Sequence, residues 1–184
     1  MCGIAGFAGV FEDQKQKIKE MIDTLDHRGP DSKGFEVFQD KAIGMTRLAI
    51  IDVAGGKQPM SLDDGSLSIV FNGEIYNHQE LKAKLENQGV HFKTSSDTEV
   101  VLNAYKYWGA EFLSKLRGMF TLAILNKRSG ELFVARDRIG IKPLYYYSEG
   151  KKLIFSSELK SILTHKSIDI TINKQAIYDY LSFR

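Results

Sequence analysis

Apolar residues near the start of the chain recur at the spacing of one helix face. They fall at i, i+3, i+4 and i+7: Ile18, Met21, Ile22 and Leu25. Because side chains three and four residues apart share one face of a helix, this spacing predicts an amphipathic helix from about Gln14 to Leu25. The Gly29-Pro30 pair that follows is a typical breaker, so the helix should end before it.

Several later segments are rich in β-branched and aromatic residues, which favours strands. They are GFEVFQD (34–40), KAIGMTRLAIID (41–52), SLSIVFNGEIY (66–76), MFTLAILNK (119–127), ELFVARD (131–137), PLYYYS (143–148) and KLIFSS (152–157). The stretch VAGGKQPMSLDDG between the second and third segments is a loop by composition. Short connections such as RSG and EGK join the last segments, which predicts antiparallel hairpins.

Further helices are predicted after the third strand. The pattern is helical from Asn77 to about Gln88 and stops at Gly89, a residue suited to the left-handed position that ends many helices. The segment SSDTEVVLNAYKYWG has Ser96 three residues before Glu99, the spacing of a capping box, with apolar residues along one face. Two late helices complete the pattern: SELKSILTH (157–165) and NKQAIYDYLSF (173–183).

The order of these segments indicates the fold class. Strands and helices come in groups and do not alternate strictly, which predicts an α+β fold with sheets covered by helices. The chain has 184 residues, of which 43% are hydrophobic, and it contains no linker-like tract. We therefore expect a single domain over residues 1–184.

Composition and charge argue against several classes of function. The 25 lysines and arginines against 23 acids give a net charge of +2 without a basic run, so we expect no nucleic-acid partner. The apolar first ten residues lack a basic flank and run into charged residues, which predicts neither a signal peptide nor a membrane span. One cysteine and four separated histidines predict no disulfide and no metal site, and a cytoplasmic location is the simplest expectation.

The single cysteine stands directly behind the initiator methionine, in MCGIAG. If Met1 is removed, Cys2 carries a thiol together with an α-amine of unperturbed pKa about 7.7–8.0, so it needs no partner histidine as base. The alternative is a small buried core residue, a usual place for a free cysteine. In FNGEIYN, the Asn72 side chain and the Gly73 N–H would supply oxyanion donors, although Asn-Gly is also a common turn.

Two charged residues are less easily explained by the fold alone. Arg47 lies within the apolar run MTRLAII, where an unpaired charge is costly unless it points out of the sheet or meets a carboxylate. Asp97, in SSDTE, would suit the first turn of a helix through the helix dipole alone. Each of these observations is weak when taken singly.

Six blocks occur in a definite order along the chain. They are Cys2-Gly3-Ile4, HRGPD (27–31), RLAIID (47–52), FNGEIYN (71–77), SSDTE (95–99) and ARDRIGIKPLYY (135–146). Together they resemble class II glutamine amidotransferases, and most of all the glutaminase domain of asparagine synthetases. The resemblance covers essentially the whole chain and implies an N-terminal nucleophile hydrolase fold: a four-layer αββα sandwich with two antiparallel sheets.

The resemblance also implies catalytic roles. Cys2 would be the nucleophile once Met1 is removed, and its freed amine the general base. Asn72 and the Gly73 N–H would form the oxyanion hole. Arg28, in HRGPD, would be a scaffold residue near the nucleophile.

Substrate binding follows from the same resemblance. Arg47 would pair with the α-carboxylate of glutamine, and Glu74 and Asp97 would hold its α-ammonium. Backbone groups near Leu48 and Ile50 would line the pocket. Such a set selects a free amino acid, because an amide within a peptide would leave these charges unpaired.

The implied reaction is hydrolysis of L-glutamine through a γ-glutamyl thioester on Cys2. The ammonia would pass to an ATP-dependent synthetase domain of the same polypeptide, where ATP and magnesium would act; no cofactor is expected in this domain. The chain ends in a predicted helix and contains no SGG-x-DS loop, so we expect that domain to lie downstream. A homodimer of the full-length protein is a further expectation.

Two other interpretations stay open. The ammonia acceptor is expected to be aspartate, but an amidotransferase half for a sugar phosphate or a cell-surface sugar acid would show the same motifs. The KPLYYY and SSELKSIL blocks favour the asparagine type, by resemblance alone. A catalytically silent domain used for assembly or regulation is the third interpretation, and the intact set of nucleophile, oxyanion donors and charged binding residues argues against it.

Overall fold

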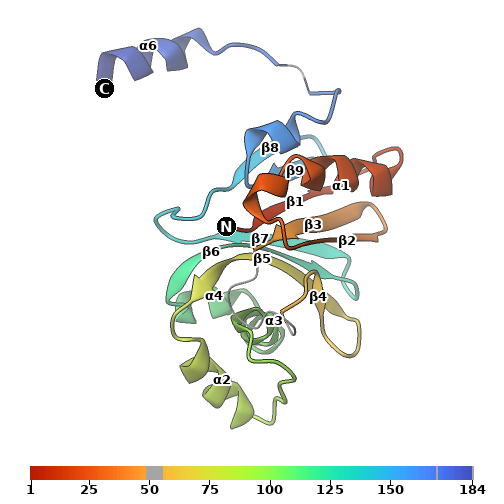
Figure 1. Cartoon of the computed structure of the whole chain (residues 1–184), viewed down its shortest axis with the longest axis vertical. Coiled ribbons are helices and arrows are strands. Elements are labelled where there is room, and N and C mark those ends of the chain that lie inside the picture. The colour runs from red at the N-terminus through yellow and green to blue at the C-terminus, as the bar shows by residue number, and fades with distance from the viewer. Residues whose placement is uncertain (49–55, 169, 184) are drawn as a thin grey trace.

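The computed structural model describes residues 1–48, 56–168 and 170–183. Two antiparallel sheets pack face to face, with helices on both outer faces (Figure 1). The first sheet has the order β2-β3-β1-β9-β8 and consists of β1 (Gly3–Ala8), β2 (Ser32–Phe38), β3 (Lys41–Arg47), β8 (Tyr145–Glu149) and β9 (Lys152–Ser156). The second has the order β4-β5-β6-β7 and consists of β4 (Met60–Ser61), β5 (Leu67–Ile75), β6 (Gly118–Asn126) and β7 (Glu131–Arg136).

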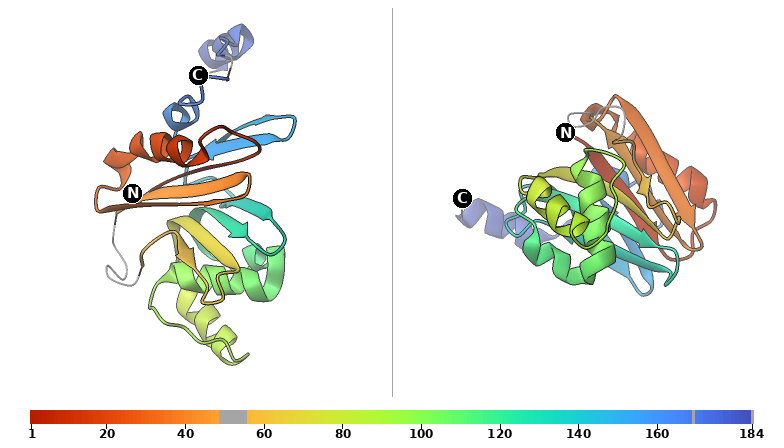
Figure 2. Two further views of the ribbon diagram at one scale, coloured as in Figure 1. Left: turned by 90° about the vertical axis from the view of Figure 1, so that its right-hand side faces the viewer. Right: turned by 90° about the horizontal axis from the view of Figure 1, so that it is seen from below.

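Helices cover the two outer faces of this pair of sheets. Helix α1 and the short α5 lie on the first sheet, and α2, α3 and α4 lie on the second (Figures 1 and 2). The α-helices are α1 (Gln14–Asp23), α2 (His78–Glu86), α3 (Asp97–Trp108), α4 (Phe112–Lys115), α5 (Leu159–Ile162) and α6 (Lys174–Phe183), with 3₁₀ turns at Asp26–Arg28 and Gly109–Glu111. Helix α6 lies apart from the sheets (Figure 2).

Three apolar clusters fill the spaces between the layers. Between the sheets lie Ile4, Ile43, Met45, Val70, Ala123, Leu125 and Phe155. A second cluster joins α1 and α5 to the first sheet, and a third joins α2, α3 and α4 to the second sheet. Because side chains alternate across a strand, β5 places Val70 between the sheets and Phe71 against the helices. Strands β5 and β6 are largely buried on both faces, which explains the apolar runs 69–71 and 122–125 within them.

Most predicted elements are present. Helix α1 covers most of the predicted segment, and Asp13 caps it by accepting the Gln16 N–H at 3.2 Å. The predicted hairpins exist, since β6 pairs with β7 and β8 with β9. Gly89 has a φ of 84°, the left-handed conformation expected after α2.

Other details of the sequence-based prediction were wrong or incomplete. Strand β1 was not predicted, because two glycines and two alanines among the six residues of GIAGFA leave no strong apolar alternation. Ser96 does cap α3 by accepting the Thr98 N–H, but Glu99 binds the N–H groups of Lys93 and Thr94, which lie further back than a capping box requires. The predicted late helix 157–165 has only four helical residues in α5.

The segment between β3 and β5 was predicted as a strand end and a loop. In the described part, β3 ends at Arg47, and residues 49–55 lie outside the described residues. The loop contains the short strand β4, which pairs with β5. Within the described residues, no helix combines the length and the apolar character that crossing a bilayer requires.

Candidate active site

A cavity of about 100 Å³ lies where β1, β3 and β5 meet the start of α3. Seven residues with predicted roles line it: Cys2, Arg47, Leu48, Asn72, Gly73, Glu74 and Asp97. They come from four segments that are distant in sequence, so only the folded chain brings them together. The remaining predicted residue, Ile50, lies outside the described residues.

Cys2 lies directly before β1, and strand pairing sets its position. Gly3 is opposite Thr46, which brings Cys2 to the end of β3. There the Leu48 N–H donates to Cys2 Sγ at 3.4 Å, and the sulfur lies 3.6 Å from the Leu48 carbonyl oxygen. The thiol is half-buried at the edge of the cavity. Cys2 is therefore not fully buried, although its side chain packs against the apolar cluster between the sheets.

Arg28 contacts the backbone of the same residue. Its Nε donates to the Cys2 carbonyl oxygen at 3.0 Å, and its Nη1 donates to Glu158 Oε1 at 3.0 Å. Burial alone would raise the pKa of the Glu158 carboxyl, but hydrogen bonds from Arg28 and His27 outweigh it and lower that pKa to about 2. Glu158 therefore stays ionised at neutral pH and orients Arg28.

Asn72 lies within β5, opposite Thr121 of β6, and Gly73 follows it in the same strand. The alternative of an Asn-Gly turn is thus wrong. Asn72 is 1% exposed, and its buried Nδ2 has no hydrogen-bond partner among the described residues. Buried donors are nearly always paired, so an unpaired amide at a cavity wall is a donor available to a ligand. A Cβ on Gly73 would lie 2.4 Å from the Met119 carbonyl oxygen, which excludes larger residues without a backbone shift.

The charged residues of the cavity are largely removed from solvent. Arg47 is 6% exposed at the end of β3, so it does not point outward. Asp97 is 5% exposed, and its Oδ2 accepts the Ile75 N–H at 3.0 Å. Burial raises the pKa of the Asp97 carboxyl, and the bond from Ile75 offsets only part of this effect. With Glu74 half-buried beside them, both signs of charge line one small cavity, as binding of a zwitterion requires.

Comparison with known proteins identifies the family. The profile of the glutamine amidotransferase domain matches residues 1–184. The chain belongs to this family. Asparagine synthetase [glutamine-hydrolyzing] 1 of Bacillus subtilis is 46% identical over 189 residues, which cover 98% of this chain and 30% of that protein. Asparagine synthetase [glutamine-hydrolyzing] of Zea mays is 42% identical over 166 residues, covering 88% of this chain and 28% of that protein.

Solved structures support the same assignment for this amidotransferase domain. The glutamine phosphoribosylpyrophosphate amidotransferase from B. subtilis matches with a TM-score of 0.74 and 31% identity, over 88% of this chain and 43% of that one. The predicted N-terminal nucleophile hydrolase fold, an α+β sandwich of two antiparallel sheets between helices, is confirmed. The domain spans about 30% of the length of the B. subtilis relative, so it corresponds to one part of that longer protein.

Sequence reasoning missed two further residues in the cavity of the amidotransferase domain. Gln58 joins three segments: its Oε1 accepts the Phe71 N–H at 2.6 Å, while its Nε2 donates to the Phe71 carbonyl oxygen at 3.3 Å and to Thr98 Oγ1 at 3.2 Å. Lys142 lines the cavity from the loop between β7 and β8. Neither stands out in sequence, because Gln58 belongs to a loop-like segment and Lys142 is one of many lysines. Only their place in the folded domain reveals them.

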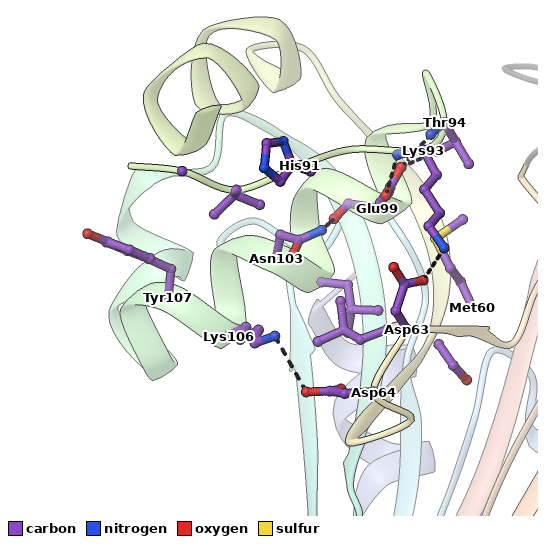
Figure 3. A pocket seen from close by; sticks show the side chains of 15 residues that line it. Met60, Asp63, Asp64, His91, Lys93, Thr94, Glu99, Asn103, Lys106 and Tyr107 are labelled. Carbon is purple, nitrogen blue, oxygen red and sulfur yellow. Dashed lines mark hydrogen bonds and ion pairs between the residues drawn. The ribbon is translucent and has the colours of Figure 1, made fainter. Parts of the chain in front are cut away.

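A larger hollow of about 570 Å³ lies elsewhere, between the β4–β5 turn and α3 (Figure 3). None of the predicted site residues lines it. Its charged side chains pair with one another, as Lys93 does with Asp63 and Lys106 with Asp64. Glu99 is likewise bound to the Thr94 N–H at 2.7 Å. The smaller cavity, with its unpaired amide, is therefore the better candidate for chemistry.

Proposed function

We propose that this amidotransferase domain hydrolyses L-glutamine to glutamate and ammonia, with Cys2 as the nucleophile. One observation carries the proposal. A half-buried thiol and a buried, unpaired Asn72 amide line the same cavity as Arg47, Glu74 and Asp97. A nucleophile, an oxyanion donor and charged groups for an amino acid are the parts that an amide-hydrolysing site for free glutamine needs.

The proposed chemistry begins after removal of Met1. The α-amine of Cys2 takes the thiol proton, and the sulfur attacks the side-chain amide carbon of glutamine. Asn72 Nδ2 and the Gly73 N–H stabilise the oxygen that becomes negative. The proton then passes from the amine to the departing nitrogen, ammonia leaves, and a γ-glutamyl thioester remains on Cys2. Water, deprotonated by the same amine, hydrolyses the thioester to glutamate and restores the thiol.

Selectivity for the free amino acid would come from charge. Arg47 binds the α-carboxylate, for which its planar guanidinium is well suited. Glu74 and Asp97 bind the α-ammonium. The Leu48 N–H binds the Cys2 sulfur, and Leu48 also lines the cavity beside it. A peptide-bound glutamine has neither of these charges, so it would bind without the ionic contacts that the free amino acid makes.

The wider function is proposed from the relatives. We infer that residues 1–184 form one glutaminase domain of a longer polypeptide, whose synthetase domain uses ATP and magnesium to transfer the ammonia to aspartate. Curated relatives named glutamine-hydrolysing asparagine synthetases support this, because this chain matches only 24–30% of the length of two B. subtilis examples. A homodimer of the full-length protein and a cytoplasmic location belong to the same proposal.

The decisive experiment measures the intact mass of the purified chain before and after exposure to a diazo-ketone analogue of glutamine. We expect a chain lighter by one methionine that gains a single adduct. Free glutamine should protect against the adduct, and a peptide with internal glutamine should not. Cys2→Ala is the matched control and should take no adduct. A processed chain that stays unlabelled while folded would contradict the proposal.

A second experiment tests the acceptor in the full-length polypeptide. With amide-labelled glutamine, ATP, magnesium and aspartate, we expect the label in asparagine. Transfer of the label to a sugar phosphate supplied in place of aspartate would instead favour the alternative amidotransferase function.

A further inference from the structure

Lys142 is a buried cation to which the proposed chemistry assigns no role. Its side chain lines the same cavity as Cys2 and is only 7% exposed. Its Nζ donates to Met1 Sδ at 3.5 Å, and no other hydrogen bond or ion pair of this side chain is found in the described part of the chain. A thioether is a weak acceptor, so it compensates poorly for the water that a buried ammonium loses. Such a charge is costly unless it acts on something in the cavity.

The loop around Lys142 holds its backbone in place. Asp137 Oδ1 accepts the Ile141 N–H at 2.9 Å, and Asp137 Oδ2 accepts the Lys142 N–H at 3.0 Å. Arg136 Nε donates to the Lys142 carbonyl oxygen at 2.7 Å. Burial alone would raise the pKa of the Asp137 carboxyl, but its backbone hydrogen bonds outweigh burial and lower it. The Lys142 side chain therefore enters the cavity from a rigid support.

The contact with Met1 places this ammonium near the start of the chain. Lys142 Nζ binds the sulfur of Met1, and Met1 is joined by its peptide bond to the Cys2 nitrogen. Cys2 itself is held at both ends, since Arg28 binds its carbonyl oxygen and Leu48 binds its sulfur. We therefore expect Cys2 to stay in place when Met1 is removed. Its new α-amine then shares a cavity of about 100 Å³ with the Lys142 ammonium.

We propose that Lys142 is a positioning residue, whose ammonium keeps the α-amine of the processed Cys2 in its unprotonated form. The inference rests on the proposed function, in which that amine is the general base. Two like charges in a small, desolvated space destabilise one another, so the amine loses its proton at a lower pH. An ordinary α-amine, with a pKa of about 7.7–8.0, is mostly protonated at neutral pH and is then no base.

Other charged groups around the cavity do not replace this effect. They are Arg28, Arg47, Glu74, Asp97, Arg136, Asp137 and Glu158. Arg28 is neutralised by Glu158, and the residues flanking Lys142 bind backbone groups. In the proposed function Arg47 faces the α-carboxylate of glutamine, and Glu74 and Asp97 share its single α-ammonium, so one negative charge remains at that end of the cavity. In the described part of the chain, none of these groups forms an ion pair or a hydrogen bond with the Lys142 side chain, so no direct contact neutralises its charge.

The first test compares the pH dependence of Cys2 labelling by the diazo-ketone glutamine analogue, between about pH 5 and 9, in wild type and variants. Lys142→Met keeps the apolar stem and removes the charge. We expect the acid limb of its profile, which is the fall in Cys2 labelling at low pH, to move up by about one pH unit. Labelling near pH 6.5 should then fall roughly tenfold. Lys142→Arg should retain the wild-type limb. Lys151→Met, at an exposed position between β8 and β9, is the matched control.

Several outcomes would overturn the inference. One is an unchanged acid limb in folded Lys142→Met. Another is a weaker apparent affinity for the analogue without any shift in pH dependence, which would make Lys142 a substrate-binding residue. If Lys142→Met does not fold, Lys142→Gln gives the same comparison.

A second test uses the wild-type chain alone. The pH dependence of reductive methylation of the Cys2 α-amine, followed by mass, should give a pKa below the ordinary range of about 7.7–8.0. A value within that range would overturn the inference. This measurement also separates the two proposals. A chain with a lowered amine pKa that takes no glutamine analogue would refute the proposed function alone, whereas a labelled chain with an ordinary amine would refute only the role of Lys142.

Discussion

Arg28 binds the carbonyl oxygen of Cys2 through Nε at 3.0 Å, although Cys2 precedes β1 and Arg28 ends the 3₁₀ turn before β2. The same guanidinium is bound by Glu158, just beyond β9. The position of the proposed nucleophile thus depends on an ion pair between the 3₁₀ turn before β2 and the segment after β9. This relationship explains a charged pair near the start of β1 better than a surface role would, because the Arg28 side chain is only 11% exposed.

Replacing Glu158 by glutamine should loosen this support. Its pKa is about 2 in the folded protein and near 4.5 when unperturbed, so its ionised form adds stability above pH 4.5 that is lost as the pH falls toward 2. We expect Glu158→Gln to lower the free energy of unfolding by about 1–2 kcal/mol at pH 7 and to slow Cys2 labelling. Denaturant unfolding at pH 7 and near pH 2 measures the first effect. Glu12→Gln, at an exposed position, should change neither quantity.

Asn72→Ala should remove activity without removing the fold. Its Nδ2 has no partner among the described residues, so truncation loses no hydrogen bond of that group. Loss of one oxyanion donor lowers kcat by about 10²–10³. Glutamine hydrolysis and thermal unfolding, measured on the same preparation, check both statements. Asn103→Ala should show the opposite pattern, because Asn103 Nδ2 donates to the Glu99 carbonyl oxygen at 3.0 Å and lies outside the cavity. Wild-type turnover in Asn72→Ala would remove Asn72 from the mechanism.

Gly73→Ala should disturb both stability and activity. The added Cβ would lie 2.4 Å from the Met119 carbonyl oxygen and 2.7 Å from Phe120 Cα, which are backbone atoms of the neighbouring strand. Forcing β5 and β6 apart should cost about 1–3 kcal/mol. Gly65→Ala is a useful comparison, since nothing lies within 4 Å of its Cβ and only its left-handed φ of 65° is strained. We expect that variant to keep full labelling of Cys2; equal losses in both variants would contradict the steric argument.

Asp97→Asn should weaken glutamine binding more than it slows turnover. Asparagine can still accept the Ile75 N–H, but it provides no charge for the α-ammonium of the substrate. We expect KM to rise by about tenfold or more with a smaller change in kcat. Burial raises the pKa of the Asp97 carboxyl above 3.8, so this group takes up its proton at a higher pH than an exposed aspartate does. As the solution is acidified, the wild-type KM should therefore begin to rise at that higher pH. An unchanged KM would place Asp97 outside the substrate site.

His165 should make stability depend on pH. It is 3% exposed beside Phe7 and Phe11, and burial lowers its pKa from 6.5 to about 4. A group whose folded pKa is lowered in this way takes up its proton more readily in the unfolded chain. The contribution of His165 to the free energy of unfolding is therefore complete above pH 6.5. It falls between pH 6.5 and about 4, by on the order of 2–3 kcal/mol.

His165→Phe should remove most of that slope, as denaturant unfolding at pH 7 and pH 5 would show. His91→Gln, at an exposed position, should keep it. A wild-type slope that survives in His165→Phe would assign the pH dependence to other groups.

The sequence pointed to residues that the fold brings into one cavity, but it did not show how they are held there. Cys2, Asn72 and Asp97 could be proposed because the order of six sequence blocks resembles class II glutamine amidotransferases; the chemistry of each residue taken singly was a weak indication. Gln58 could not, since its importance lies in bonds to Phe71 and Thr98, which belong to other segments. Nothing in a linear pattern indicates that a loop glutamine will join a strand to a helix.

The sequence by itself determined the local elements: α1, the hairpins, the cap of α3 by Ser96, and the α+β class. These depend on interactions between residues near one another in the chain, so periodicity and turn chemistry reveal them. The tertiary structure alone decided that β1 lies between β3 and β9, that Asn72 is buried without a partner, and that Lys142 reaches Met1. The physical reason is that burial and desolvation arise only when distant segments close around a group, and these two effects give the candidate site its chemistry.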